Sequence, residues 1–513
     1  MSARTSSIAT AAPASGDSTG VTQRKATPSK AEFFQQGNNG GLMPYVAATH
    51  EERYSILDRR LAKERKTLGL GLLKTLGLIT VALWIALPIF WGSLYLTLQY
   101  LSNLTIYLVD LDTAASGSSA IVGPAFRAMA SNSNAMSTKF IETAHLGYVI
   151  RDAADYPRGV YDAMDEVTNK DCWGAIVVNA NATSAWRAAV ESGDASYDPS
   201  GSVGIFYQGA RYYQIILLYL APFMIRNTRT ALQTASSTAR STLLASLSNT
   251  YTAPASAPAS FQLVTTTLGA LQAVPQALAT PFGFYQHDLR VQTQWAASAV
   301  FEASDIYYLI FAFQLCLWQN SAQQKTQLGK KLTLRSLIGL RFMIPVFFYF
   351  FMATFQIPFT ATMGRAGFIV QWMLNYLLLL SLGLALETML SVLTQAFLPF
   401  FLIFWIIPSS FQPMELMMDF YKFLRWVPFY HHTEASKIIM FNTAPGHALG
   451  VHFGAIAGLV GVDIIGLSLA VWFERWRDER MEKKEKKEKK KAEEKEKEEK
   501  RGRDEVDRGE SGS

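Results

Sequence analysis

Residues 75–98 read TLGLITVALWIALPIFWGSLYLTL, and this stretch decides the fold class. It carries no charge over more than the ~20 residues that a helix needs to cross the ~30 Å hydrocarbon layer of a membrane. Basic residues crowd the chain before it, whereas the next basic residue after it is Arg127. Because cationic flanks stay in the cytosol, we predict a span with the N-terminus inside and residue 100 onward outside. The flanking basic residues are Arg53, Arg59, Arg60, Lys63, Arg65, Lys66 and Lys74.

Five more apolar segments predict further spans toward the C-terminus. The stretch from Phe368 to Pro408 would be about 60 Å long as one helix, roughly twice the hydrocarbon thickness. We therefore divide it into two spans at a tight turn near Leu393 to Gln395. The predicted boundaries of the five spans are 299–320, 337–356, 368–391, 396–412 and 451–472.

The segment 299–320 is the least regular of these spans, because Glu302 and Asp305 lie near one end of it. An amphipathic helix lying in the membrane interface is the alternative interpretation. A dense basic cluster from Lys325 to Arg341 follows, and such clusters are typical of cytosolic loops. The chain must therefore return to the cytosol before Lys325, and this segment is the best candidate for the crossing.

We therefore predict a polytopic α-helical membrane protein with about six transmembrane helices and a large mixed α/β extracytoplasmic domain between the first and second. Residues 1–50, rich in Ser, Ala, Thr and Gly, are predicted to be a disordered cytosolic tail without a signal peptide. Residues 51–74 form a basic cytosolic flank. Residues 474–513 form a charged cytosolic tail, which we expect to be a solvated helix. Binding of its basic part to anionic lipid is the alternative.

Residues 102–295 are enough for one extracytoplasmic domain. Buried-strand patterns occur at 173–179 (WGAIVVN) and 203–208 (VGIFYQ). Between them, Thr183 is predicted to cap a helix that runs to Ser192. The alternation of strands and helices indicates a mixed α/β core.

The same domain carries further local features. A long helix with an apolar face is predicted over 211–232. Asn103 and Asn181 head N-x-T sequons and are candidate glycosylation sites. Cys172 lies in the domain and Cys316 in a predicted span, so we expect no disulfide between them.

Four runs of sequence carry a resemblance to a known family. DCWGAIVVNANATSAW (171–186) and VGIFYQGARYY (203–213) lie in the domain, whereas GFIVQWMLNYLLLLSLGLALETML (367–390) and FLIFWIIPSSFQP (401–413) lie in the spans. They resemble the fungal nitrosoguanidine-resistance membrane proteins, a DUF3533-type family, over most of residues 70–475. The resemblance implies a fungal membrane protein linked to drug and mutagen tolerance. It also implies a layout similar to ABC-2-class permeases and phage-infection-type proteins.

The last predicted span carries a charge near its midpoint. Asp463 there costs roughly 3 kcal/mol on insertion scales. It is either a proton, cation or substrate contact, or a hydrogen-bonded carboxyl that locks helices together. Gly454, Gly458 and Gly461 precede it at a spacing typical of close helix packing, within the chain or in a homo-oligomer.

The span 368–391 carries a row of polar and small residues. Gln371, Asn375, Gly383 and Glu387 are predicted to follow one drifting ridge of the helix. We expect Asn375 to bond to a neighbouring helix, whereas Glu387 either does the same or reaches lipid headgroups. Lining of a pore is the alternative. Asp463, Asn375 and Glu387 together are the candidate intramembrane polar site.

The outer segment 413–448 precedes the last span. Its first part, Met414 to Trp426, has the pattern of an amphipathic interfacial helix; packing on the α/β domain is the alternative. His431 and His432 are adjacent, so their side chains would not converge on one metal ion.

Several motifs are absent from the sequence. It has no phosphate-binding loop, no G-x-S-x-G, no H-E-x-x-H and no protein-kinase set, so we expect no enzymatic activity, metal or cofactor. The leading hypothesis is a transport or efflux-like protein that confers resistance to toxic small molecules. The alternative is a non-transporting regulator or scaffold that affects lipid distribution or partner assembly.

The composition and the family resemblance also indicate partners and location. No basic stripe interleaved with aromatic residues suggests nucleic acid. The expected partners are the lipid bilayer, small-molecule drugs and a second copy of the chain. The family resemblance favours the plasma membrane, and the charge clusters place both termini in the cytosol.

Overall fold

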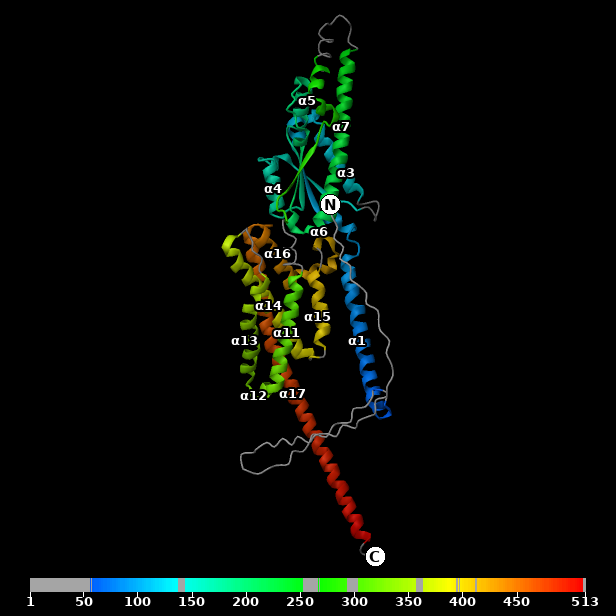
Figure 1. Cartoon of the computed structure of the whole chain (residues 1–513), viewed down its shortest axis with the longest axis vertical. Helices are drawn as coiled ribbons and strands as arrows, with labels where there is room; N and C mark the ends of the chain where they lie inside the picture. Colours follow the sequence, from blue (N-terminus) through cyan, green and yellow to red (C-terminus); the bar gives the residue numbers. More distant parts are fainter. Residues whose placement is uncertain are drawn as a thin grey trace, which may run out of the picture. The chain divides into compact units, whose positions relative to one another are not determined.

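The computed structural model describes residues 56, 58–136, 144–251, 266, 268–292, 303–356, 363–393, 395, 397–410 and 413–510. Contacts divide the chain into two units, Met1–Thr75 and Leu76–Ser513. The predicted disordered tail 1–50 lies outside the described residues. The second unit holds the α/β domain and the bundle of apolar helices (Figure 1).

The first apolar helix, α1, runs over Ala62–Leu94 and contains Pro88. Its side chains are mostly exposed, including Trp84 at 77% and Trp91 at 61%. An apolar helix of this length with open sides is suited to a lipid environment. It ends four residues before the predicted boundary, and a 3-10 turn, Gln99–Asn103, leads into the sheet.

The α/β domain is built on a five-stranded mixed sheet in the order β2-β1-β3-β4-β5. Strand β1 pairs in parallel with both β2 and β3, β3 pairs antiparallel with β4, and β4 pairs in parallel with β5. The strands predicted at 173–179 and 203–208 are confirmed as β3 and β4. The bounds are Thr105–Asp110 (β1), Gly147–Arg151 (β2), Gly174–Val178 (β3), Val203–Tyr207 (β4) and Phe284–Asp288 (β5).

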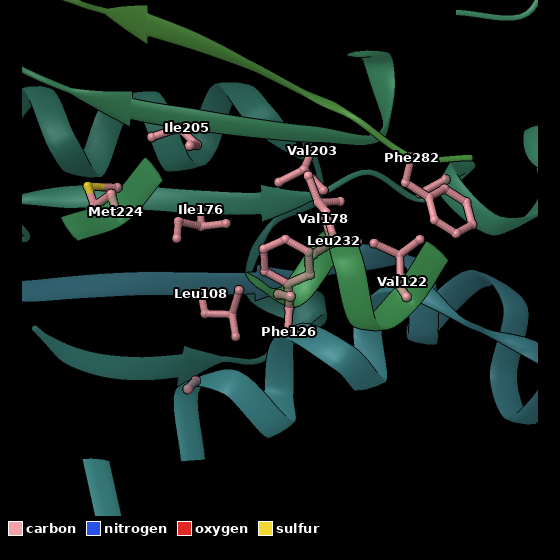
Figure 2. Packing of buried hydrophobic residues seen from close by; sticks show 14 of the residues in the cluster. Leu108, Val122, Phe126, Ile176, Val178, Val203, Ile205, Met224, Leu232 and Phe282 are labelled. Carbon is pink, nitrogen blue, oxygen red and sulfur yellow. The ribbon is translucent and has the colours of Figure 1, made fainter. Parts of the chain in front are cut away.

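Alternating side chains of the strands build two cores. On one face, Leu108, Ile176 and Ile205 pack against Phe126 and Met224 from the covering helices (Figure 2). Helices α3 (Val122–Met136), α5 (Ala182–Ser192) and α7 (Ala221–Tyr251) cover this face. Helix α4 (Val160–Thr168) covers the other face. A sheet buried on both sides explains the continuous apolar runs of its strands.

Two local predictions in this domain need correction. The helix predicted over 211–232 begins as a short turn and a π-helical stretch, Ile216–Leu220, and then continues as α7 to Tyr251. The π stretch precedes Pro222, which has no N–H to donate to a regular helix. Thr183 does not cap α5 either, because it lies inside the first turn and its N–H is bound by Asp112.

In the part of the chain that the structure describes, seven more α-helices follow in the bundle. Those that include predicted spans are α11 (Ser304–Thr326), α13 (Leu334–Met352), α14 (Gly364–Leu393), α15 (Leu398–Ile406) and α17 (Gly446–Glu510). The short α12 (Leu328–Lys331) connects α11 to α13, and α16 (Pro428–Phe441) precedes α17. Helix α14 ends at Leu393, at the position of the predicted turn.

Four helices are long and apolar enough to cross a membrane within the described residues: α1, α13, α14 and α17. Helix α11 does not meet these criteria, and the apolar helix Leu398–Ser409 is short of the ~20 residues that a span needs. The count of six spans therefore stays a prediction. Helix α17 joins the last span and the charged tail in one continuous helix, which confirms the helical tail as far as Glu510.

The segment after α15 differs from the prediction of one amphipathic helix over Met414–Trp426. It forms two 3-10 helices, η10 (Met414–Leu416) and η11 (Asp419–Trp426). Tyr421 donates a hydrogen bond from its hydroxyl to the carbonyl of Ile89 in α1, at 2.7 Å. This contact fixes η11 against the first apolar helix, a constraint that the local sequence does not show.

Candidate functional site

Helix α14 carries polar contacts at three heights, each with a different set of neighbours. Asn375 meets α16, Ser381 meets α17, and Ser391 meets α13. Asn375 and Ser391 lie about 24 Å apart along the helix axis, at 1.5 Å per residue. Polar contacts therefore recur along α14, which has the largest buried share of the four described helices that could cross a membrane.

Beside the Asn375 contact, an aspartate and a histidine lie against each other, shielded from solvent. Nδ1 of His432 in α16 lies 2.6 Å from Oδ1 of Asp305 in the first turn of α11, and both side chains are 0% exposed. Thr433 donates a hydrogen bond to Oδ2 of Asp305 at 3.3 Å. The ring of Tyr308 packs edge-on against the imidazole. Burial of two opposite charges costs several kcal/mol per ion before their attraction is counted, so apolar residues would hold these helices at lower cost.

The second ring nitrogen of His432 faces an amide. Nε2 lies 3.0 Å from Oδ1 of Asn375, and Gln371 donates to the same oxygen at 2.9 Å. Nδ2 of Asn375 donates to the carbonyl of Ala353, which fixes the orientation of the amide. Both ring nitrogens of His432 therefore lie close to oxygen atoms, one of a carboxylate and one of an amide. Gln371 also donates to Ser436 at 3.0 Å and so joins α14 to α16.

A cavity of about 370 Å³ lies between the α/β domain and this end of the bundle, and we call it the junction cavity. Thr433, Glu434 and Lys437 of α16 line one wall, and Lys170 and Arg211 of the α/β domain line another. Because Thr433 also bonds to Asp305, one side chain separates the cavity from the buried ion pair. A hydroxyl in that position can accept a proton on one side and donate one on the other.

An ion cluster in the junction cavity ties the α/β domain to the bundle. Nζ of Lys170 lies 2.6 Å from Glu434, and Nζ of Lys437 lies 3.0 Å from the same carboxylate. The side chain of Lys437 is only 2% exposed. Burial tends to raise the pKa of Glu434, but the two ammonium groups outweigh it and lower that pKa below its usual range. Glu434 is therefore ionised and holds both lysines.

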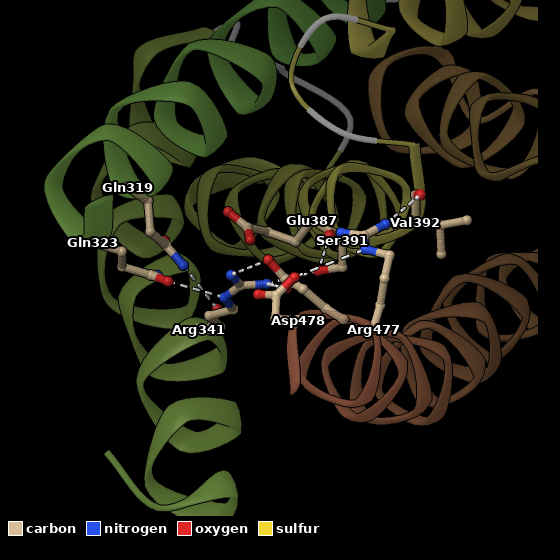
Figure 3. A network of polar contacts seen from close by, with 9 residues as sticks. Gln319, Gln323, Arg341, Glu387, Ser391, Val392, Arg477 and Asp478 are labelled. Atoms are coloured by element: carbon tan, nitrogen blue, oxygen red, sulfur yellow. Dashed lines mark hydrogen bonds and ion pairs between the residues drawn. The ribbon is translucent and has the colours of Figure 1, made fainter. Parts of the chain in front are cut away.

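A third polar network lies at the end of the bundle nearest the charged tail (Figure 3). Arg341 of α13 is central to it, with its side chain 6% exposed. Its guanidinium donates to Ser391 of α14 at 2.6 Å, to Gln323 of α11 at 3.0 Å and to Glu474 of α17 at 2.7 Å. Glu387 lies buried beside it. Four helices are thus joined through one side chain.

The three residues of the candidate intramembrane polar site do not lie together. Asn375 belongs to the His432 network and Glu387 to the Arg341 network. Asp463, half-buried in α17, accepts a hydrogen bond from Ser381 at 2.8 Å. That contact fits the interpretation of a carboxyl that joins two helices.

The polar and small residues on the drifting ridge of α14 do not all face one neighbour. Gln371 and Asn375 face α16, whereas Gly383 lies against the ring of Tyr349 in α13. Glu387 follows Asn375 by twelve residues, and twelve residues turn an α-helix about 120° beyond whole turns. The row therefore drifts around the helix to a different neighbour instead of lining one path.

The three glycines predicted to pack against another helix have no close neighbour among the described residues. In the described part of the chain, no atom lies within 4 Å of the position that a Cβ would take at Gly454, Gly458 or Gly461. All three lie on the exposed side of α17. None of the described helices of this chain packs against these three positions, and packing in a homo-oligomer stays a prediction.

The two sequons differ in their surroundings. Asn181 is exposed at the N-cap of α5. Asn103 donates its side-chain amide to the carbonyl of Glu415 at 2.9 Å, which ties η2 to η10. A glycan on Asn103 would compete with this contact, so the geometry favours Asn181.

The adjacent histidines of α16 point to different partners. His432 faces Asp305, whereas Nδ1 of His431 lies 3.1 Å from Nδ1 of His452 in α17. Among the described residues, no group of three or more His, Cys, Asp or Glu side chains could hold a metal ion.

Local sequence patterns do not predict the contact of His432 with Asp305 or the ion cluster of Lys170 with Glu434. Asp305 weakens the apolar pattern of its span, although a carboxylate in an apolar helix is itself a signal of a buried partner. Its partner His432 lies 127 positions away in the sequence, beyond the reach of any local pattern. Lys170 and Glu434 are separated even further, and neither belongs to a motif.

Comparison with known proteins now gives the family. A family model described as "Protein of unknown function (DUF3533)" matches residues 75–465. The chain belongs to this family. An uncharacterized endoplasmic reticulum membrane protein of Saccharomyces cerevisiae is 30% identical over 130 residues, which cover 24% of this chain and 25% of that protein. No solved structure matches.

These similarities and the apolar helices support a membrane location for the protein. The family part of the predicted resemblance is confirmed, because the family model covers both the α/β domain and the bundle. The match to the yeast protein spans a quarter of its length. Nitrosoguanidine resistance, the plasma membrane and the orientation of the termini stay predictions.

Proposed function

We propose that this protein transports toxic small molecules, including nitrosoguanidine-type drugs, and couples their movement to protons at the His432–Asp305 pair. The supporting observation is the fully buried pair itself, one hydroxyl away from the junction cavity. Buried ionisable residues in membrane bundles mark proton and ion paths. Imidazole is the side chain that exchanges protons near neutral pH, and the sequence carries no ATP-binding motif that would supply energy in another way.

The proposed coupling follows from the electrostatics of the pair. With His432 protonated, its charge compensates Asp305 and the helices α11 and α16 stay together. Loss of that proton leaves the Asp305 carboxylate buried without a counter-charge, which is strongly unfavourable. The bundle then relaxes by separating α11 from α16 or by protonating Asp305 through Thr433. A solute that prefers one of these two states would move with the proton.

The test is flux in liposomes that contain the purified full-length chain. A panel of cationic drugs, nitroso compounds and labelled phospholipids is offered with and without an imposed pH gradient. We expect at least one solute to move faster with the gradient, and Asp305→Asn and His432→Gln to abolish that acceleration. Asp463→Asn is the matched control, because Asp463 is a second carboxylate of the bundle outside this network.

Two results of this assay would contradict the proposed proton site or the transport function. Acceleration that persists in Asp305→Asn but is lost in Asp463→Asn would move the proton site to the α14–α17 contact and contradict the proposal. No flux of any solute in the wild-type protein would favour the alternative, a regulator or scaffold. The continuous charged helix α17 is the observation that favours that alternative. Truncation after Glu479 would then remove drug tolerance in cells.

A further inference from the structure

The junction cavity has an excess of positive charge. Twenty residues line it, and their charged members are four cations and two acids. They are Lys170, Arg211, Arg425 and Lys437 against Glu415 and Glu434. Among the described residues of the lining, cations therefore outnumber acids by two.

The ion cluster of Lys170, Lys437 and Glu434 contains two of these cations and one of the acids. Lys170 and Lys437 share the single carboxylate of Glu434, at 2.6 and 3.0 Å. Burial lowers the pKa of Lys437, Glu434 opposes this, and the neighbouring cations Lys170 and Arg211 add to it. A bound anion would supply the missing counter-charge.

Arg211 adds a second cation on the side of the α/β domain. It donates to the carbonyl of Cys172 at 2.6 Å, and its guanidinium stacks 3.9 Å from the ring centre of Trp173. Burial lowers the pKa of Arg211. These contacts fix the side chain at the cavity, where its charge also faces the carboxylates of Glu415 and Glu434. Arg425, exposed on η11, donates to the sulfur of Met414 at 3.3 Å.

Part of the remaining wall of the cavity is apolar. Met417, Leu424 and Phe429 line it and are each no more than 3% exposed. On the outer side of η11, Phe420 and Trp426 are 68% and 79% exposed. Exposed aromatic side chains beside an apolar bundle are typical of the headgroup level of a membrane. The cavity thus combines cations with an apolar wall at the expected depth of lipid headgroups.

We propose that the junction cavity binds an anionic membrane lipid, with its phosphate or carboxylate against Arg211, Arg425 and Lys437 and its acyl chain along the apolar wall. The volume of about 370 Å³ is in the range of small-molecule sites and suits a headgroup. Arginine binds such oxyanions with two parallel hydrogen bonds. The inference goes beyond the proposed function, because binding requires no transport.

The test is equilibrium binding to the full-length protein in a neutral detergent. The probes are dioctanoyl phosphatidylserine, dioctanoyl phosphatidylcholine and glycerol phosphate, followed by tryptophan fluorescence and by the melting temperature. Trp173 stacks on Arg211, so its emission reports on the site. We expect phosphatidylserine to bind about tenfold more tightly than phosphatidylcholine, and glycerol phosphate to compete only weakly.

A matched pair of variants on η11 localises the site. Arg425→Gln removes an exposed cation that lines the cavity, and we expect it to weaken phosphatidylserine binding about tenfold. Lys422→Gln removes a cation three residues away that is 58% exposed, pairs with Asp419 and lies outside the lining. It should leave binding unchanged. Both positions are exposed, so both variants should fold, and the melting temperature without ligand checks this.

Three results would overturn the inference. Equal affinity for phosphatidylserine and phosphatidylcholine would remove the role of charge. Equal losses in Arg425→Gln and Lys422→Gln would place the effect outside the cavity. Displacement of the lipid by glycerol phosphate at the same concentration would assign the site to soluble phosphates instead of a lipid. None of these results depends on whether the protein transports a solute.

Discussion

At the scale of single residues, Asp112 joins two helices of the α/β domain. It is 0% exposed and receives four hydrogen bonds from two helices. Thr183 donates its N–H and hydroxyl at 2.9 and 2.7 Å, and the N–H groups of Val122 and Gly123 donate at 3.2 Å. One carboxylate therefore caps the N-termini of α3 and α5 together, where the first N–H groups of a helix lack partners.

We predict that Asp112→Ala destabilises these two helices by about 2–4 kcal/mol, because it leaves two helix ends and the buried Thr183 hydroxyl without an acceptor. Hydrogen–deuterium exchange of the peptides that cover α3 and α5 measures the loss. Asp194→Ala, an exposed turn residue of the same domain, is the control and should not change their protection. Unchanged protection in Asp112→Ala would show that the carboxylate is dispensable.

The sequence could not assign this role. Thr183 has the residue type and position of a helix cap, so the local pattern favours it. Asp112 lies 71 residues earlier, and only the pairing of β1 with β3 brings the two together. The same limit applies to His432 and Asp305. Residue types indicated that partners exist, but long-range pairing decides which partners they are.

At the scale of elements, apolar length was the most reliable signal. Four predicted spans correspond to the apolar helices α1, α13, α14 and α17. A charge-free stretch of ~20 residues is the length that a helix needs to cross a membrane. The weaker predictions concern segments with mixed character. Helix α11 contains Asp305, whose charge is hidden by a partner on α16, and the helix predicted over Met414–Trp426 divides into two 3-10 turns.

The Arg341 network is the main polar tie between helices at the tail end of the bundle. We predict that Arg341→Gln lowers the stability of the bundle by about 1–3 kcal/mol, because Glu474 and the buried Glu387 lose their cation. The melting temperature of the detergent-solubilised protein measures this. Arg335→Gln, an exposed position on the same helix α13, is the matched control. Equal melting of the two variants would contradict a structural role for Arg341.

At the scale of the whole molecule, the charge distribution predicts the side of the membrane on which each part lies. The basic flank 51–74, which includes the start of α1, and the charged end of α17 are expected in the cytosol, and the α/β domain is expected on the opposite side. The ion cluster of Lys170 with Glu434 and Lys437 holds that domain against the bundle. The sequence predicted the two parts but not their contact, because the contact depends on the tertiary fold.

Glycosylation tests this orientation. In a eukaryotic host we expect a glycan on Asn181, which is exposed, and none on Asn103, whose amide is bonded to Glu415. Asn181→Gln should therefore increase mobility on a gel to that of enzymatically deglycosylated protein, and Asn103→Gln should not. A glycan confined to Asn103 would contradict the local geometry. A protease-protected tag at residue 181 in sealed cytosolic-side-out vesicles supports the same orientation, whereas cleavage there would reverse it.

The claim on which the functional account depends is that the His432–Asp305 pair carries a proton when a solute crosses. Simultaneous recording of solute entry and internal pH in proteoliposomes tests it most directly, with a pH dye inside the vesicles. The account predicts that each solute that responds to a pH gradient moves with a fixed ratio of protons, and that His432→Gln eliminates the proton movement. Solute entry with no change of internal pH, or an unchanged ratio in His432→Gln, would contradict it.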